Sequence, residues 1–582
     1  MRSLSPLVVL ACLLVVELVA PRPALAVWPA LGREIAAAIK NQERPKATTD
    51  GAAGAIVVWQ DARDLRLNIF ARRVLAAGEL DPSWPIDGRA LLADPAALET
   101  AVDGQELPVI ASDGTGGAIV AWQDGRSAGG LDIFAQHVLR SGVVDPAWPA
   151  NGRALCTARG AQDNPAIVSD GAGGAIVTWM DRRGTFTDVD IFAQHVLASG
   201  VVDPRWPVDG VALSTAPALQ LSPNITSDGS GGAIVTWSDF RPAASAIDVY
   251  AQHVLNAGVV DPAWPVNGRA LTLAPGTQID PTIVSDNAHG AIVSWEDQRD
   301  GPSHIFAQRV LGSSAIAPGW PANGLAVCVS TDDEVHPLLT SDGASGAIIT
   351  WRDARSGLNH NPFAQHVLGT GSVDPGWPVN GRALTSSSGE QVAAAIVGDG
   401  AAGAIISWEE DSFVFVNHIL GSGTLDPTFP VNGRFVRLLL TFQHNPDLAA
   451  SGAHNAIVVW SDADTDQDFN IYGQLAETSI TLAVDPPTPT ADIAFAPPAP
   501  NPAIGAVTMR FTLSHAANVS LAIFDPAGRR VRALASGTQS EGEHIFTWDL
   551  RDESGRATGA GVFLARLEVE GHVVTRKLAK LK

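Results

Sequence analysis

A short pattern of turn residues followed by an apolar run recurs along most of this chain. Its clearest copy is Asp170–Arg183, where Asp-Gly-Ala-Gly-Gly precedes Ala-Ile-Val-Thr-Trp, and Met-Asp-Arg-Arg follows. The glycines supply the positive φ values of a tight hairpin turn, and a β-branched and aromatic run suits a strand covered on both faces. The pattern occurs eight times, each time with a tryptophan at the same place: Trp59, Trp122, Trp179, Trp237, Trp295, Trp351, Trp408 and Trp460.

Each repeat predicts four short strands and no helix. In the third repeat a strand over 164–169 precedes the central one, another follows over 190–197, and a turn leads to an extended segment over 206–213. That last segment opens with a Trp-Pro motif, which also recurs: Trp28, Trp84, Trp148, Trp206, Trp264, Trp320 and Trp377, with Phe429 as the substituted eighth. Four strands in about 57 residues, repeated eight times, predict an all-β, eight-bladed β-propeller over residues 27–483.

The alternatives are an open β-solenoid or several smaller sandwiches. A solenoid needs terminal caps unlike its body, whereas the first and last units here look nearly like the others. The pattern leaves open whether the Trp-Pro strand completes its own blade or the previous one. In the second case the N-terminal Trp28 strand would pair with the last blade and close the ring.

The two ends of the chain predict different segments. Residues 1–26 have a positive start, an apolar run and a small-residue site at Ala24-Leu25-Ala26, which predicts a signal peptide cleaved after Ala26 and a secreted or cell-surface protein. An uncleaved anchor and lipidation at Cys12 are the alternatives. Residues 484–493 are a proline-rich linker, and the alternating runs of 494–582 predict a small antiparallel β-sandwich.

Several motifs of this last region carry a family resemblance. They are Pro500-Asn501-Pro502, Phe524–Arg529, Gly542-Glu543-His544, Trp548-Asp549 and Gly561-Val562-Phe563. Together they resemble the FlgD-type immunoglobulin-like domain and the C-terminal sorting domain of type IX secretion substrates, with Asp525 as a departure from the sorting pattern. The resemblance implies that secretion machinery is a partner and that this domain carries the protein across the outer membrane or onto the surface. The repeats resemble uncharacterised secreted bacterial propeller-like proteins, a resemblance that implies no function.

The net charge limits the classes of binding partner, and the cysteine positions limit the disulfides that could form. The formal charge of −23 argues against nucleic acid and anionic membranes, and no membrane span is expected in the mature chain. Cys156 and Cys328 occupy the same place in two repeats that lie three repeats apart, so a disulfide is not expected and both should be small buried side chains.

Repeated polar residues are interpreted as structural. Asp181 and Arg183 typify an Asp-x-Arg motif found in six repeats, which either grips an acidic sugar or, as we favour, ties each strand end to the next loop. The hairpin aspartate, such as Asp170, resembles the Asp-box of sialidase propellers with different spacing and is expected to cap backbone amides. No cofactor and no metal are therefore expected, with calcium left open because one carboxylate per turn falls short of six to eight oxygens. The third-strand histidines, such as His195, should hydrogen-bond between blades or face solvent.

No catalytic motif stands out, so departures from the repeat become the candidate binding residues: Glu409, Glu410, Asp411, Asp462 and Asp464, with Asp466 and the longer loop 93–106. The sequence predicts a secreted or surface recognition propeller for a glycan or protein, with a role in adhesion or carbohydrate binding, and it favours a binding protein over an enzyme. A glycoside hydrolase or lyase acting at one channel mouth, and a structural surface-layer component, are the alternative hypotheses.

Overall fold

The computed structural model describes residues 28–477 and 494–580, apart from 30, 65, 93–103, 128, 186, 242–246, 356, 358, 388, 438–440, 453, 464–467, 496–497, 500–502, 504, 514, 526–528, 560 and 570–571. The predicted signal peptide and the whole of the predicted linker lie outside these residues. The chain divides between residues 479 and 480 into two compact units.

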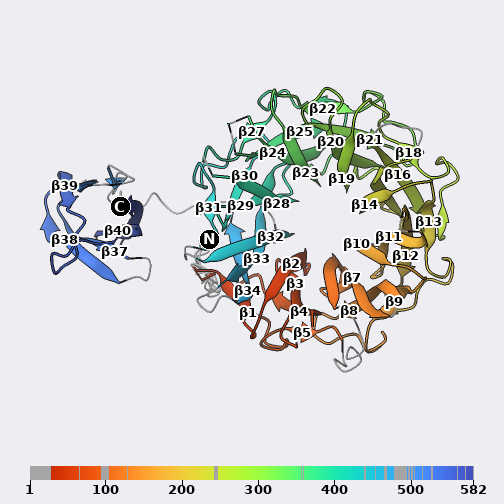
Figure 1. The fold of residues 1–582 in the computed structure, drawn as a ribbon, viewed down its shortest axis with the longest axis horizontal. Helices are drawn as coiled ribbons and strands as arrows, with labels where there is room; N and C mark the ends of the chain where they lie inside the picture. The colour runs from red at the N-terminus through yellow and green to blue at the C-terminus, as the bar shows by residue number, and fades with distance from the viewer. Residues whose placement is uncertain are drawn as a thin grey trace, which may run out of the picture. The chain divides into compact units, whose positions relative to one another are not determined.

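The described residues of the first unit form eight antiparallel sheets arranged as blades around a central channel (Figure 1). Blade one holds β2 (Gln42–Thr49), β3 (Ala55–Asp61), β4 (Asn68–Val74) and β5 (Arg89–Ala90). Blade two holds β6 (Gln105–Ser112), β7 (Ala118–Ser127), β8 (Gly130–Val138) and β9 (Arg153–Cys156). Blade three holds β10 (Gln162–Ser169), β11 (Ala175–Thr185), β12 (Asp188–Val196) and β13 (Val211–Ser214). Blade four holds β14 (Gln220–Ser227), β15 (Ala233–Asp239), β16 (Asp248–Leu255), β17 (Val259–Val260) and β18 (Arg269–Ala270).

The remaining blades repeat this order. Blade five holds β19 (Gln278–Ser285), β20 (Ala291–Asp297), β21 (His304–Val310) and β22 (Leu325–Cys328). Blade six holds β23 (Glu334–Ser341), β24 (Ala347–Asp353), β25 (Asn361–Leu368), β26 (Ser372–Val373) and β27 (Arg382–Ala383). Blade seven holds β28 (Gln391–Gly398), β29 (Ala404–Glu410), β30 (Phe413–Ile419) and β31 (Arg434–Phe435). Blade eight holds β32 (Phe442–Ala450), β33 (Asn455–Ala463), β34 (Phe469–Glu477) and, from the start of the chain, β1 (Arg33–Ala36).

The N-terminal strand closes the ring. Strand β1 pairs antiparallel with β34, with Arg33 opposite Gly473, and β2 contacts β32 across the junction. The Trp-Pro segment therefore completes the previous blade, which resolves the question that the sequence left open. Trp28 makes the same link as its six tryptophan counterparts, because its Nε1 donates to the carbonyl of Ala76 in blade one at 3.2 Å.

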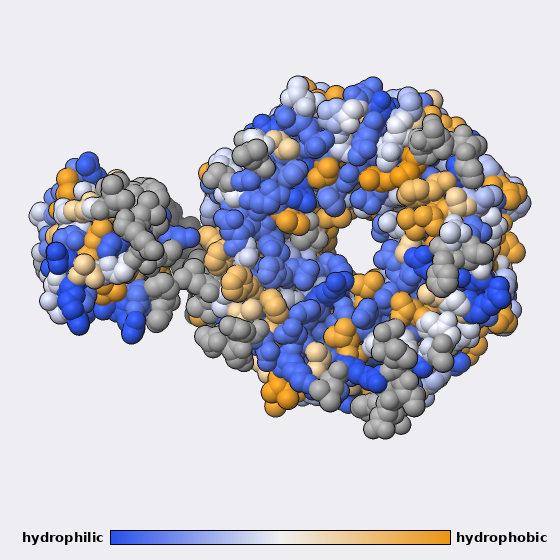
Figure 2. Space-filling view, in the orientation of Figure 1, coloured by the Kyte–Doolittle hydropathy of each residue, from blue (hydrophilic) through white to orange (hydrophobic). Residues whose placement is uncertain are grey.

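The first strand of each blade lines the channel, which Figure 2 shows open at the centre of the ring. Each of these inner strands contacts the inner strand of the next blade. The second and third strands are buried along almost their whole length, because a neighbouring blade covers each face. This explains why their sequences are continuous apolar runs, and the prediction of an eight-bladed propeller is confirmed.

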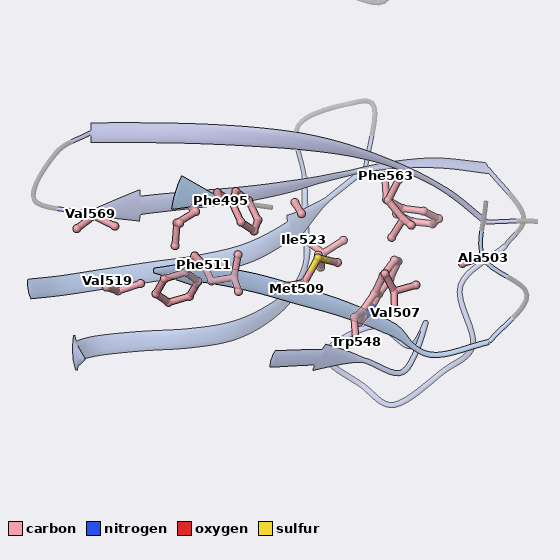
Figure 3. Packing of buried hydrophobic residues seen from close by; sticks show 14 of the residues in the cluster. Phe495, Ala503, Val507, Met509, Phe511, Val519, Ile523, Trp548, Phe563 and Val569 are labelled. Carbon is pink, nitrogen blue, oxygen red and sulfur yellow. The ribbon is translucent and has the colours of Figure 1, made fainter. Parts of the chain in front are cut away.

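The second unit is a β-sandwich with one apolar core. One sheet holds β35 (Ala494–Phe495), β36 (Val507–Leu513) and β39 (Gly542–Trp548), and the other holds β38 (Arg530–Gln539), β37 (Ala517–Phe524), β40 (Gly561–Val569) and β41 (His572–Lys580). Side chains alternate between buried and exposed along β36, so one face packs inward. Phe511, Met509 and Trp548 meet Ile523 and Phe563 between the sheets (Figure 3). Among the described residues, no helix has the length and apolar character needed to cross a membrane.

Candidate functional site

The central tryptophan of each blade anchors the Asp-x-Arg motif. Trp179 is fully buried, and its Nε1 donates to Asp181 Oδ2 at 2.9 Å. Arg183 Nε donates to Asp181 Oδ1 at 2.8 Å, and its guanidinium lies 3.7 Å from the ring centre of Phe192. Arg183 also donates to the carbonyl of Asp209 at 2.7 Å. The carboxylate and the guanidinium are thus bonded within the blade, so this geometry supports the structural interpretation of the motif and not a grip on an acidic sugar.

Blades seven and eight replace the missing arginine in different ways. In blade eight Asp462 accepts from Trp460 Nε1 at 3.0 Å and pairs with Arg437, whose guanidinium lies 3.8 Å from the ring centre of Tyr472. The arginine is therefore supplied from another part of the chain. In blade seven a phenylalanine takes the place of the arginine. The ring of Phe415 is the counterpart of Phe192, which Arg183 covers in blade three, and the Phe435 ring lies 4.3 Å from it.

The candidate acidic residues do not form one site. Glu410 and Asp462 are buried inside their blades, and Glu410 bonds to Ser387 Oγ. Asp411 is exposed in the turn between β29 and β30, where its φ is 49°. Asp464 and Asp466 lie outside the described residues, as does most of the loop 93–106. Among these candidates, Glu409 is the described residue that lines a cavity.

A second polar cluster ties together the turns of most blades, and we call it the hairpin junction. It joins the hairpin aspartate, the basic residue of the third strand and the aspartate of the Trp-Pro loop. In blade four Asp228 Oδ1 accepts from the amides of Ser230 and Gly232, as in an Asx-type turn, while its Oδ2 lies 3.0 Å from His253 Nε2. His253 Nδ1 lies 2.9 Å from Asp261 Oδ2. The histidine bonds within its own blade, so the expectation of a bond between blades or of solvent exposure was wrong.

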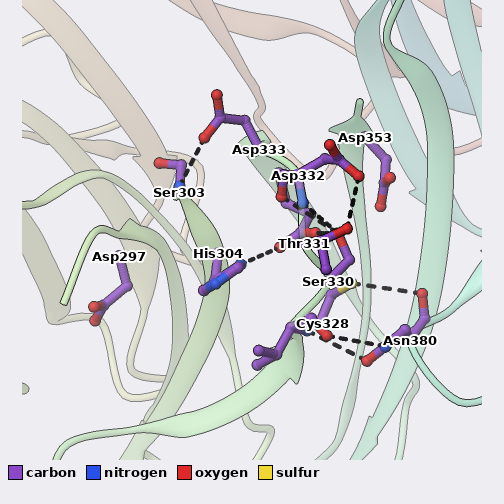
Figure 4. Close-up of polar contacts among 12 residues, drawn as sticks. Asp297, Ser303, His304, Cys328, Ser330, Thr331, Asp332, Asp333, Asp353 and Asn380 are labelled. Carbon is purple, nitrogen blue, oxygen red and sulfur yellow. Dashed lines mark hydrogen bonds and ion pairs between the residues drawn. The ribbon is translucent and has the colours of Figure 1, made fainter. Parts of the chain in front are cut away.

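The two cysteines occupy matching seams between blades. Both are free and buried, and burial raises the pKa of Cys156 to about 12 and that of Cys328 further, so both are neutral thiols. Beside Cys328, the buried Glu334 carboxylate lies 2.7 Å from His304 Nδ1, a pair that replaces the glutamine of most other blades (Figure 4). Arg355 donates to Cys328 Sγ at 2.8 Å and to Asp353. Its guanidinium already provides a positive charge beside these groups, which disfavours a metal ion there.

The inner strands share an unusual bend at the channel. Each has a β-bulge next to an X-Pro pair in blades one to six and eight, and the residue before the proline has φ between 50° and 56°. These residues are Arg44, Leu107, Asn164, Ser222, Asp280, His336 and Asn445. A residue before proline normally adopts an extended conformation. The positive φ of these seven residues is therefore unfavourable by itself, and the surrounding fold stabilises it. Bulges of this kind re-aim side chains, and here they sit at the channel wall.

The bulges of blades one, two, three and eight, together with Val392 and Glu409 of blade seven, line a cavity of about 440 Å³. Its wall combines polar and apolar groups: Arg44, Pro45, Lys46, Leu107, Pro108, Val109, Asn164, Pro165, Val392, Glu409, Asn445 and Pro446. Arg44 and Lys46 are exposed, while Pro45 between them is buried and fixes the wall. The cavity is the strongest candidate site in the described part of the chain, because charged and amide groups converge there from blades distant in sequence.

Two ion pairs set the charge of this wall. Glu409 Oε1 lies 2.8 Å from His444 Nδ1, and the hydrogen bond with Glu409 raises the pKa of His444 against the opposing effect of burial. Lys46 Nζ lies 3.4 Å from Asp447 Oδ1. Of these groups, the sequence singled out Glu409 alone. The recurrence of X-Pro at the start of seven of the eight first strands was the available signal for the others, since proline is uncommon inside a paired strand.

A known domain family matches most of the second unit, and several solved structures are similar to parts of the chain. Residues 503–571 match the FlgD Ig-like domain. No curated protein sequence matches the chain. Among solved structures, the chain is similar to the α-L-arabinofuranosidase Arb93A of Fusarium graminearum, with 10% identity, a TM-score of 0.33, and coverage of 54% of this chain and 93% of that one.

Two further solved structures show comparable likeness. The α-L-arabinanase of Penicillium chrysogenum, complexed with arabinobiose, has 14% identity and a TM-score of 0.31, covering 55% of this chain and 93% of its own. A polysaccharide lyase of family PL25, an ulvan lyase, has 11% identity and a TM-score of 0.36, covering 76% and 95%. At these values the similarity concerns the fold and says nothing about the ligand.

Proposed function

We propose that this protein is an exported recognition propeller that binds a glycan at its central channel. The observation that carries this proposal is the cavity at the bulged inner strands. Its amides at Asn164 and Asn445 and its charged groups at Arg44 and Glu409 suit sugar hydroxyls, and its prolines and Leu107 offer apolar surface to a sugar ring. A binding site that combines a few convergent polar groups with apolar walls fits a carbohydrate better than an extended, flat protein surface.

The export part of the proposal depends on the second unit. The FlgD Ig-like match and the signal-peptide pattern of residues 1–26 together support secretion, with this domain as the element that the type IX machinery recognises. Deleting residues 494–582 should leave the propeller inside the cell envelope, which fractionation of the producing bacterium would detect.

The cavity wall favours recognition over glycoside hydrolysis. Glu409 is the one carboxylate among the described lining residues, whereas glycosidases generally use two carboxyl groups on either side of the bond. Glu409 is also engaged by His444 at 2.8 Å. A hydrolase would require a second acid from elsewhere, and turnover of a bound glycan that is lost in Glu409→Gln would establish that alternative.

Glycan-array screening of the mature chain, followed by calorimetry on each hit, tests the proposed function. Arg44→Asn should weaken binding about tenfold, because it removes a charged donor while asparagine tolerates the positive φ. The matched control is Ser222→Asn, which places the same residue at the same bulge of blade four, outside the cavity. A silent array, or equal affinity of the Arg44→Asn protein and the parent, would reject a glycan site here.

A further inference from the structure

Three metal-ligating side chains meet where blades five and six adjoin at the channel. Asp280 lies on β19, Glu296 on β20 and His336 on β23. One ligand atom from each lies within 4.8 Å of the others, and His336 Nδ1 is 3.8 Å from Glu296 Oε1. Asp280 and His336 hold the same pre-proline position in successive blades, with φ values of 52° and 54°. The bulged backbone therefore places Asp280 and His336 at equivalent points of two adjacent inner strands.

Glu296 carries a charge that its surroundings compensate poorly. Its side chain is 6% exposed, and the carboxylates of Asp280 and Asp333 lie nearby. The amide of His336 donates to Glu296 Oε1 at 2.6 Å, and Ser303 Oγ donates to Oε2 at 3.4 Å. Among the described residues, no lysine or arginine forms an ion pair with this carboxylate.

At the position of Glu296, other blades hold either a neutral side chain, a cation, or a carboxylate that is paired with a histidine. Glu409, one position after the central tryptophan of blade seven, has a histidine 2.8 Å away. In blade six the same position holds Arg352, and in blade two it holds the neutral Gln123, which accepts from the amide of Asn164 at 3.2 Å. Blades two and three thus have the same backbone link as blades five and six, without the charge and without the ligand set.

We propose that Asp280, Glu296 and His336 bind a divalent transition-metal ion such as Zn²⁺. Two carboxylates and an imidazole are a common donor set for such ions, and the imidazole disfavours Ca²⁺ and Mg²⁺, which take oxygen ligands. The ion would neutralise the buried Glu296 and link two adjacent blades. Three protein ligands leave a coordination position for water, and the His336 side chain is 58% exposed, which gives the ion a route to the site. This inference revises the sequence-based expectation of no metal, and it stands independently of the proposed glycan binding.

Calorimetric titration of the EDTA-treated mature chain with Zn²⁺ tests the proposal. One Zn²⁺ per chain should bind, and E296Q/H336N should lower its affinity at least a hundredfold. This double variant copies the Gln123 and Asn164 pair of blades two and three, so it should retain the fold, which circular dichroism and thermal melting would verify. Asp280→Asn, a milder change, should weaken the same site by a smaller factor.

Two further measurements make the test specific. Substituting Co²⁺ should give visible absorption bands in the parent that the double variant lacks, and Ca²⁺ should not compete. The matched control is E390Q/H360N, which removes a Glu–His pair 3.0 Å apart that has no third ligand among the described residues and should leave Zn²⁺ affinity unchanged. Identical Zn²⁺ isotherms for the parent and E296Q/H336N, no Zn²⁺ binding by the parent, or loss of binding in the control would overturn the proposal.

Discussion

Blades one and four build the same hairpin junction around different cations. In blade four the His253 ring lies between Asp228 and Asp261, at 3.0 and 2.9 Å. In blade one Arg73 takes the position of the histidine and pairs with Asp50 at 2.6 Å and with Asp81 at 2.9 Å. The geometry is shared, but the guanidinium is always charged, while the imidazole is charged only when both ring nitrogens carry protons.

Blade eight shows that the junction can also be made without charge. Its hairpin aspartate is replaced by Ser451, whose Oγ donates to the carbonyl of Ala53 at 2.6 Å, and Leu475 stands opposite Ile457 where the other blades place histidine or arginine. Blade eight therefore lacks both the hairpin carboxylate and the cation that pairs with it in other blades. The comparison indicates that the fold requires each buried charge of the junction to have a partner rather than any one residue, because removing one partner of a buried pair leaves an uncompensated charge.

The largest effect should follow from removing one cation alone. His253→Leu leaves the buried Asp228 and the partly buried Asp261 without a positive partner, which should lower the free energy of unfolding by about 3–5 kcal/mol. Urea unfolding of the mature chain, followed by tryptophan fluorescence, measures the change. Adding Asp228→Ser, which approaches the Ser451 and Leu475 arrangement of blade eight, should recover part of the loss. If the single and double variants were equally unstable, charge balance would not be the governing factor.

An intermediate effect should appear in the pH dependence of stability. Burial opposes the charge of His253 and of His418, but hydrogen bonds with two aspartates each outweigh it and raise both pKa values. Their contribution is therefore fully present below the unfolded histidine pKa of about 6.5 and is lost as the pH rises through the folded value. For Asp228 and Asp399 burial is likewise outweighed by hydrogen bonds, those with histidine first, and their pKa values are lowered. Their contribution is present above the unfolded value of about 3.9 and is lost as the pH falls.

These opposite dependences predict greatest stability between about pH 4 and pH 6.5. Urea midpoints of the mature chain measured from pH 3 to pH 9 would reveal the maximum. A midpoint that continued to rise from pH 6 to pH 9 would contradict doubly protonated imidazoles in these junctions.

The sequence predicted the propeller because its strands repeat both their apolar runs and their turn glycines. Trp59 and the seven tryptophans aligned with it established the count of blades, and each lies fully buried in a second strand. The strand that closes the ring could not be chosen, since β1 and its counterparts have the same Trp-Pro signature whichever neighbour they join.

The candidate site was harder to predict because it depends on backbone conformation. Asn164 and Asn445 lie some 280 positions apart and meet only when the ring closes, and their positive φ values contradict the local preference of a residue before proline. Glu409 stood out because it breaks the repeat. Asp462 followed a similar break but lies in its blade core, because Arg437, distant from the motif, supplies the missing guanidinium.

The smallest effect should come from exchanging one balanced junction for another. His253→Arg gives blade four the cation of blade one, and Arg73 shows that both aspartates can be reached from this position. At pH 6 the variant should unfold within about 1 kcal/mol of the parent, since charge balance is kept and only packing against Trp264 changes. At pH 9 the histidine is closer to its neutral form than at pH 6 while arginine keeps its charge, so the variant should be the more stable of the two. Urea midpoints of the variant and the parent at both pH values measure the difference in stability. A variant less stable than the parent at pH 9 would show that ring packing, rather than charge, distinguishes these blades.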